Sequence, residues 1–79
     1  MELGEKLKLM RTRERMTQGE MAAEVEISLS SLKNYELGLR KEVSALALLK
    51  ITTHPRFKKY TLWLMCDEIA PECGQVSPV

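Results

Sequence analysis

The most informative segment of the chain is residues 17–38, which read TQGEMAAEVEISLSSLKNYELG. Its first four residues match a capping box, in which the Thr17 hydroxyl accepts a hydrogen bond from the amide of Glu20 while the Glu20 carboxylate accepts one from the amide of Thr17. This pattern predicts a helix from Gln18 to about Val25. The side chains expected to be buried along it are Met21, Ala22 and Val25.

A second helix is predicted after a turn of only a few residues. Ser28 is well suited to cap it, because a serine hydroxyl can accept a hydrogen bond from a free amide of the first helical turn. The helix should extend through Asn34 or Leu37, and Gly38 follows as the expected left-handed residue at its end. Its apolar side consists of Leu32 and Tyr35. The segment therefore predicts two short helices joined by a tight corner.

Helices are also predicted on both sides of this corner, and strand signals are weak throughout. The three further helices span residues 2–15, Ser44 to about Thr52, and His54-Pro55 to about Cys66. Pro55 suits the first position of the last helix, because its missing amide needs no partner there. The expected fold class is all-α, a compact bundle of about five helices over residues 1–66. Residues 67–79 lack periodicity and are expected to form an extended or irregular tail.

Length and composition exclude several classes of protein. The chain has 79 residues, of which 44% are apolar and 29% charged, with a net charge of +1, and this indicates one small globular domain. No apolar run approaches the ~20 residues of a membrane-spanning helix, and no signal peptide is expected. Cys66 and Cys73 indicate reduced thiols in a cytoplasmic protein rather than a disulfide framework.

The outer side of the helix after Ser28 has a composition suited to DNA recognition. It carries no acidic side chain and consists of Ser28, Leu29, Ser30, Ser31, Lys33 and Asn34. The second helix of such a corner can enter the DNA major groove, where Asn34 can pair with adenine and Leu29 can contact a thymine methyl group. On these residues alone, an ordinary solvated helix face is an equal alternative.

The whole segment closely resembles the helix-turn-helix of the lambda-repressor/Cro-like (XRE) regulators, which typically read T-Q-x-x-L-A-x-x-x-G-[VI]-S-x-x-x-[IL]-S-x-[YW]-E-x-G. The match covers residues 17–38 without a gap, and the flanking helices extend it to roughly residues 3–65. The resemblance implies a compact bundle of four or five helices that acts as a dimeric transcriptional regulator on double-stranded DNA.

The resemblance also implies roles for particular residues. The residues expected to face the bases are Ser28, Leu29, Ser30 and Asn34. The residues expected to lie at the DNA backbone are Gln18, Ser31, Lys33, Arg40 and Lys41. Arg11 and Glu36 match positions that form a structural ion pair in phage repressors, and breaking a partly buried pair of this kind costs several kcal/mol.

Three departures from the family pattern affect these expectations. Glu26 replaces the usual glycine of the turn, so either the turn differs or a left-handed glutamate costs on the order of 1 kcal/mol. Arg15 replaces another frequent glycine just before the capping box. Leu29 is apolar where polar base-reading side chains are common, which puts the reading of that base position in doubt.

Two further features concern contacts with DNA and with a second copy of the chain. Residues 50–59 carry four basic residues and no acid, which leaves open whether Arg56, Lys58 and Lys59 reach phosphates. The last predicted helix carries more large apolar residues than one face can bury, and this surplus suggests a homodimer seam. The residues expected in that seam are Phe57, Tyr60, Leu62, Trp63 and Met65. A dimer suits a palindromic operator, because two recognition helices about 34 Å apart read two half-sites.

The competing functions differ in class. Enzyme chemistry has little support, and no cofactor is expected. His54, Cys66 and Cys73 match no zinc-site spacing, so no metal is expected either. The prediction is therefore a DNA-binding repressor, dimeric on a palindromic operator and acting at its own promoter. The main alternative is an antitoxin that uses the same fold to bind its promoter and uses the acidic tail to bind a toxin. A protein-interaction module without DNA binding is disfavoured by the lack of acids on the recognition face.

Overall fold

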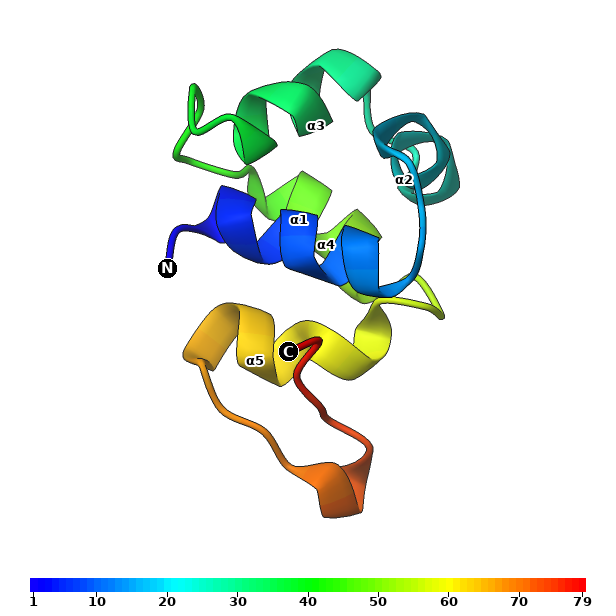
Figure 1. Cartoon of the computed structure of the whole chain (residues 1–79), viewed down its shortest axis with the longest axis vertical. Helices are drawn as coiled ribbons and strands as arrows, with labels where there is room; N and C mark the ends of the chain where they lie inside the picture. Colours follow the sequence, from blue (N-terminus) through cyan, green and yellow to red (C-terminus); the bar gives the residue numbers. More distant parts are fainter.

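The computed structural model describes all 79 residues, which form helices and connecting turns (Figure 1). The α-helices are α1 (Leu3–Arg13), α2 (Gln18–Val25), α3 (Leu29–Glu36), α4 (Ala45–Thr52) and α5 (Thr61–Cys66). The two short 3₁₀ turns are η1 (Lys58–Tyr60) and η2 (Pro71–Cys73). One isolated bridge between Ala70 and Gln75 is the only β-structure, so the predicted all-α class is confirmed. None of the helices has the length and apolar character needed to cross a bilayer.

The predicted caps set the starts of three helices. At α2, Thr17 Oγ1 accepts a hydrogen bond from the amide of Glu20 at 3.1 Å, and Glu20 Oε1 accepts one from the amide of Thr17 at 2.8 Å. The bond from the Thr17 amide also lowers the pKa of Glu20 from its ordinary value. At α3 and α4, the hydroxyls of Ser28 and Ser44 each accept a hydrogen bond, at 3.0 Å, from the amide three residues later. These three helix starts are therefore confirmed.

Helix α1 lies at the centre of the bundle, between α3 and α5 (Figure 1). Every α-helix and the turn before α5 contribute to the fully buried core, which contains Leu7, Met10, Met21, Leu32, Ile51, Phe57 and Leu64. Gly4 allows α1 to approach α3 closely, because a Cβ atom at this position would lie only 1.8 Å from the carbonyl oxygen of Tyr35. The first turn of α1 therefore packs directly on the backbone at the end of α3.

The fifth helix starts later than predicted. The prediction placed its start at residues 54–55, but the chain first makes a turn and then η1, and α5 begins only at Thr61. The amides of Phe57 and Tyr60 each donate to the carbonyl three residues back at 3.0 Å, which is the tighter spacing of a 3₁₀ turn. This geometry brings both aromatic side chains into the core, a demand of tertiary packing that the local pattern around Pro55 does not contain.

Residues 67–79 extend away from the end of α5 and then return to η1 and the start of α5 (Figure 1). Asp67 adopts a left-handed conformation that ends α5, and the chain then reverses through η2. The Gln75 side chain joins the returning segment to the start of α5, since it accepts a hydrogen bond from the Leu62 amide at 3.0 Å and donates one to the Lys58 carbonyl at 3.2 Å. The tail is thus attached to the bundle at a defined place.

Candidate nucleic-acid interface

A three-residue turn with a left-handed glutamate joins α2 to α3. Glu26 has φ 61° and ψ 45°, so the left-handed conformation is kept although a glutamate stands where the family pattern given above has glycine. From α4, Lys50 Nζ donates to the Glu26 carbonyl oxygen at 2.9 Å and holds the turn from outside. Arg15, the other glycine replacement, is also left-handed with φ 58°. A helix cannot continue through this conformation, so α1 ends at Arg13 and is shorter than predicted.

Helix α3 presents a polar side to solvent and an apolar side to the core. Leu32 and Tyr35 are buried against the bundle as predicted. On the outer side, the exposed residues are Ser28, Leu29, Ser30 and Lys33, and the half-buried ones are Ser31 and Asn34. The Ser28 and Ser31 hydroxyls lie 2.8 Å apart in a hydrogen bond, whereas the side-chain amide of Asn34 makes no hydrogen bond within the chain. Asn34 therefore keeps its full donor and acceptor capacity for a ligand.

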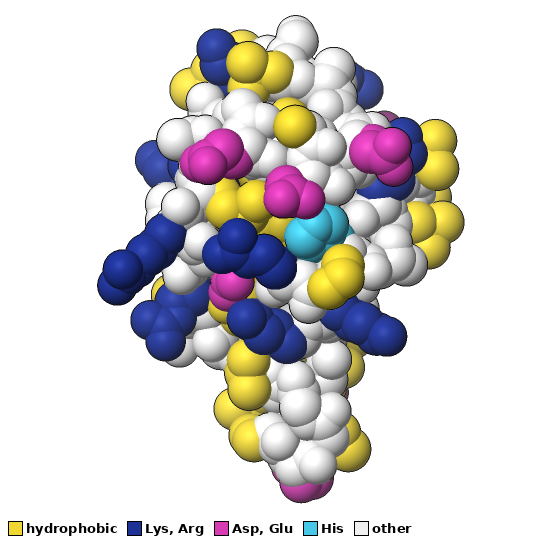
Figure 2. Space-filling view, turned by 90° about the vertical axis from the view of Figure 1, so that its right-hand side faces the viewer, with side chains coloured by type: hydrophobic (Ala, Val, Ile, Leu, Met, Phe, Trp, Pro, Cys, Tyr) yellow, Lys and Arg dark blue, Asp and Glu magenta, His cyan; other side chains and the backbone are white.

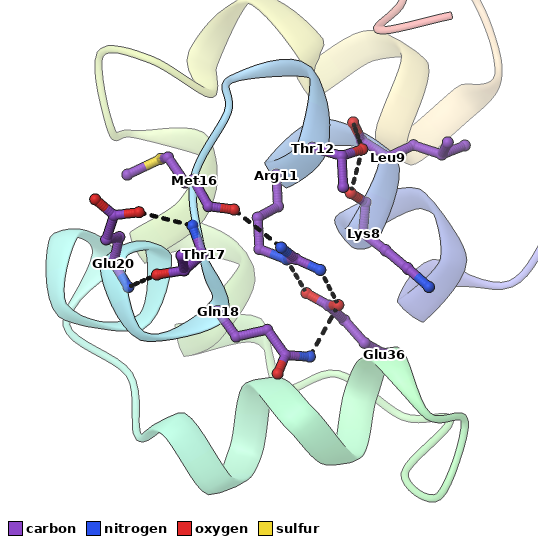
Figure 3. A network of polar contacts seen from close by, with 9 residues as sticks. All are labelled: Lys8, Leu9, Arg11, Thr12, Met16, Thr17, Gln18, Glu20 and Glu36. Atoms are coloured by element: carbon purple, nitrogen blue, oxygen red, sulfur yellow. Dashed lines mark hydrogen bonds and ion pairs between the residues drawn. The ribbon is translucent and has the colours of Figure 1, made fainter.

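An ion pair fixes the inner end of α3 to α1 (Figure 3). Arg11 Nε and Nη2 donate to the two carboxylate oxygens of Glu36 at 2.8 and 2.9 Å, and Arg11 Nη1 donates to the Met16 carbonyl at 2.9 Å. The Glu36 side chain is only 3% exposed, so this acid does not interrupt the outer face of α3. A bidentate pair of this kind gives geometric specificity as well as energy.

Gln18 extends this network from the start of α2. Its Nε2 atom donates to Glu36 Oε1 at 3.1 Å, so the side chain braces α3, as Figure 3 shows. An amide nitrogen carries two hydrogens, and only one of them is used by Glu36. The second remains available at the N-terminal end of α2, where backbone amides and the helix dipole favour an anion.

Two basic residues follow α3 in the connection to α4. The Arg40 guanidinium lies 5.2 Å from the centre of the Tyr35 ring, and its Nη1 atom approaches the Ser31 hydroxyl at 3.5 Å. Lys41 is exposed and pairs with no carboxylate. The structure therefore brings Arg40 onto the same side of the molecule as the serines of α3.

Comparison with known proteins identifies this arrangement. Residues 2–54 match the family described as helix-turn-helix domain. The chain is also 37% identical over 76 residues to Repressor protein C of Escherichia phage P2, which covers 96% of this chain and 76% of the phage protein. The chain belongs to the helix-turn-helix family. The identification of residues 17–38 as part of a phage-type, Cro-like DNA-binding regulator is confirmed. The family and the similar repressor both point to a DNA-binding regulator and not to an enzyme.

The expected dimer seam of this helix-turn-helix protein needs correction. Phe57, Tyr60 and Trp63 are 0, 2 and 8% exposed, because the core of a single chain already buries them. They offer no surface to a second copy while the chain keeps this fold. Of the five residues expected in the seam, Leu62 is half-buried and Met65 is exposed, so only these two reach the surface.

A buried lysine of α1, Lys6, forms a further tie to α5. Its ammonium group is buried beside α5, where it donates to the carbonyls of Trp63 and Leu64 at 3.1 Å and lies 5.2 Å from the centre of the Trp63 ring. It also pairs with Asp67, and its hydrogen bond lowers the pKa of that carboxyl. Nothing near Lys6 in the sequence signals this role, because its partners lie 57 residues or more further along the chain.

Proposed function

We propose that the chain is a transcriptional repressor that binds a palindromic operator in double-stranded DNA as a homodimer, including a site at its own promoter. The similarity to a protein named Repressor protein C supports repression. The observation that carries the proposal is the outer face of α3, which is polar, free of acidic side chains and held firmly on its inner side by the Arg11–Glu36 pair. Occupying such an operator would exclude RNA polymerase.

Base reading is assigned to the outer residues of α3. The unpartnered amide of Asn34 can donate and accept at adenine, which distinguishes this base in the major groove. The hydroxyls of Ser28 and Ser30 adapt to several bases, and exposed Leu29 suits a thymine methyl group. These four side chains would therefore supply sequence preference.

Backbone contacts are assigned to the residues around this face. The proposed phosphate contacts are Gln18, Ser31, Lys33, Arg40 and Lys41. Contacts of this kind fix the orientation of the protein and make affinity depend on salt, but they carry no sequence information directly. A dimer would place two α3 helices about one DNA turn apart, and so would read two half-sites.

The test is fluorescence anisotropy of the full chain against DNA from upstream of its own gene and against random DNA, each at two salt concentrations. We expect a steep salt dependence and at least ~10³-fold preference for the upstream DNA. Asn34→Ala should lose about 1–3 kcal/mol on the upstream DNA and little on random DNA. Equal and weak binding to both DNAs would refute a specific autoregulator.

Two lysine variants serve as a matched pair in the same titration. Lys41→Ala should weaken binding to both DNAs alike and reduce the slope of log affinity against log salt by about 1. Lys58→Ala removes the same charge from η1, on the far side of α1 from α3, and should leave both affinities unchanged. Equal losses in both variants would mean that overall charge, rather than the α3 side, determines binding.

A further inference from the structure

A second group of basic residues lies away from α3, around the end of α1 and the start of η1. It consists of Arg13, Arg15, Arg56 and Lys59, and we refer to it as the lateral basic surface. Figure 2 shows Lys and Arg side chains gathered across the middle of the face that it draws, around an acidic side chain that they partly cover. The proposed operator contacts do not use any of these four residues.

Glu14 organises the surface from beneath. Its side chain is 11% exposed and accepts hydrogen bonds from Arg56 Nε at 3.2 Å and Tyr60 Oη at 2.5 Å, while Lys59 Nζ lies 3.0 Å from its second oxygen. Arg56 Nη2 also donates to the Glu14 carbonyl at 2.6 Å. One carboxylate thus holds Arg56 and Lys59 in place, with close to half of each side chain still exposed.

The other two cations have no carboxylate to neutralise them. Arg13 and Arg15 are exposed and form no ion pair in the structure. Arg15 lines the same surface hollow as Arg56, and Arg13 is the last residue of α1, two positions before Arg15. Glu14 thus pairs with Arg56 and Lys59, whereas Arg13 and Arg15 stay unpaired and keep their charge for a ligand.

The lateral basic surface is separated from the recognition helix. Glu20 and Glu24 of α2 line the hollow beside Arg15 and Arg56. In Figure 2 acidic side chains lie between the basic group and the upper end of the molecule, where Figure 1 places α3. A duplex seated on α3 would meet these acids first, so the lateral surface is not an extension of the same DNA contact.

The chemistry of the surface favours phosphate groups over a protein partner. The apolar residues that line its hollow are Ala23 and the buried Met16, neither of which is a large exposed side chain, whereas protein interfaces normally have an apolar or aromatic centre. Three of its four cations are arginines, whose planar fork matches phosphate oxygens. We propose that the lateral basic surface binds the phosphate backbone of a second DNA duplex, so that one protein molecule holds two DNA segments.

Binding at this surface should be weak and without sequence preference. With three to four phosphate contacts, log affinity should fall with log salt at a slope of about −3, which corresponds to about 60-fold between 50 and 200 mM salt. The second duplex would therefore be held at low salt or at high local DNA concentration.

A bridging assay tests this proposal directly. Biotinylated upstream DNA on beads is saturated with the full chain at low salt, and capture of a fluorescent random-sequence duplex is then measured. We expect the wild-type protein to capture the second duplex and Arg13→Gln/Arg15→Gln to capture at least ~10-fold less. The control Lys8→Gln/Lys58→Gln removes the same charge elsewhere and should behave as wild type. Urea unfolding and loading of the first duplex establish that each variant folds and binds.

Each other outcome counts against the proposal. Capture that survives Arg13→Gln/Arg15→Gln would assign bridging to two α3 helices of a dimer. Absence of capture by the wild-type protein would refute a second DNA contact. Capture of poly-glutamate but not of DNA would point to an acidic protein partner. A parallel bead series with random immobilised DNA keeps this test independent of the operator, so it can succeed even if specific autoregulation fails.

Discussion

At the scale of single residues, two positions combine a left-handed backbone with a long side chain. Arg15 has φ 58° and Glu26 has φ 61°, and both stand where the resemblance led us to expect glycine. The departure from the pattern was visible in the sequence, but the sequence left open whether the turn would change. The structure keeps the turn and accepts the strain, since Lys50 and the packing of α2 and α3 hold Glu26 in place.

Replacing Glu26 with glycine should therefore stabilise the protein. Relief of the left-handed strain should exceed the added entropy of the unfolded chain and raise the free energy of unfolding by up to about 1 kcal/mol. Urea denaturation of Glu26→Gly measures this, with Glu26→Ala as the control that removes the same carboxylate but keeps the strain. A glycine variant no more stable than the alanine variant would show that the turn is unstrained.

The need for glycine at position 4, in contrast, could not be predicted from the sequence. Nothing around it suggests a requirement for glycine, since it lies inside a regular helix with ordinary backbone angles. Its requirement comes from the Tyr35 carbonyl of a helix far along the chain, which leaves no space for a Cβ atom. Contacts of this kind are set by tertiary packing, so local patterns do not reveal them.

At the scale of helices, the starts were predictable where the cap chemistry is local. Thr17, Ser28 and Ser44 each satisfy an amide three residues away, and all three helices begin where the sequence indicates. The start of α5 was misplaced because Pro55 is compatible with a helix, but Phe57 must turn into the core. Helix α1 ends two residues before the predicted end because the left-handed Arg15 cannot continue it, and Glu14 just before Arg15 is held by contacts with Arg56, Lys59 and Tyr60.

Those contacts centre on Glu14 and make one part of stability depend on pH. Burial alone would raise the pKa of Glu14, but hydrogen bonds from Tyr60, Lys59 and Arg56 together outweigh it, so this pKa is lowered from its ordinary value of 4.5. In the same pair, burial and then Glu14 raise the pKa of Tyr60 to about 12. A carboxyl with a lowered pKa in the folded state stabilises the protein above its unfolded pKa, and this contribution disappears as the pH falls through the folded pKa.

The variant Glu14→Gln should show this dependence. Its free energy of unfolding should be lower than that of the wild type at pH 7, and the difference should shrink as the pH falls below 4.5, because the wild-type carboxyl then becomes protonated. Urea denaturation between pH 3 and pH 7 measures the difference. Glu72→Gln, which removes an exposed carboxylate of the tail, is measured alongside as the control for the loss of one negative charge. A difference for Glu14→Gln that does not change with pH would show that the Glu14 contacts do not stabilise the junction between α1 and η1.

At the scale of the whole molecule, α1 connects α3 at one end of the bundle with α5 towards the other. The bundle measures 36 × 22 × 21 Å, with α3 towards one end of the long axis and residues 67–79 towards the other (Figure 1). On one side of α1, Arg11 fixes the recognition helix, and on the other, Lys6 fixes α5. The Arg11–Glu36 pair was predicted from the family resemblance. The contacts of Lys6 with α5 were not predicted, because no local sequence pattern marks a lysine that will be buried.

The burial of Trp63 changes which residues of α5 are expected to contribute to a dimer. Trp63 is buried under Lys6, so Trp63→Ala should act mainly on folding and lower the free energy of unfolding by about 3–5 kcal/mol. Met65 is 54% exposed and adjoins half-buried Leu62 on α5, so these residues are what remains of the proposed seam. Self-association and folding should therefore be separable in this protein.

Met65→Asp should weaken self-association without unfolding the chain. A carboxylate at a seam would have to lose its water without gaining a partner, so the dissociation constant should rise at least ~10-fold while urea denaturation of the monomer changes little. Sedimentation equilibrium measures the dissociation constant. The control is Leu37→Asp, because Leu37 is also a large exposed apolar residue and lies just beyond the end of α3. If Met65→Asp leaves the dimer intact while Leu37→Asp disrupts it, the seam lies beside the recognition helix rather than on α5. In that case the seam beside Leu37, and not the one on α5, would set the distance between the two α3 helices and hence the spacing of the half-sites in the operator.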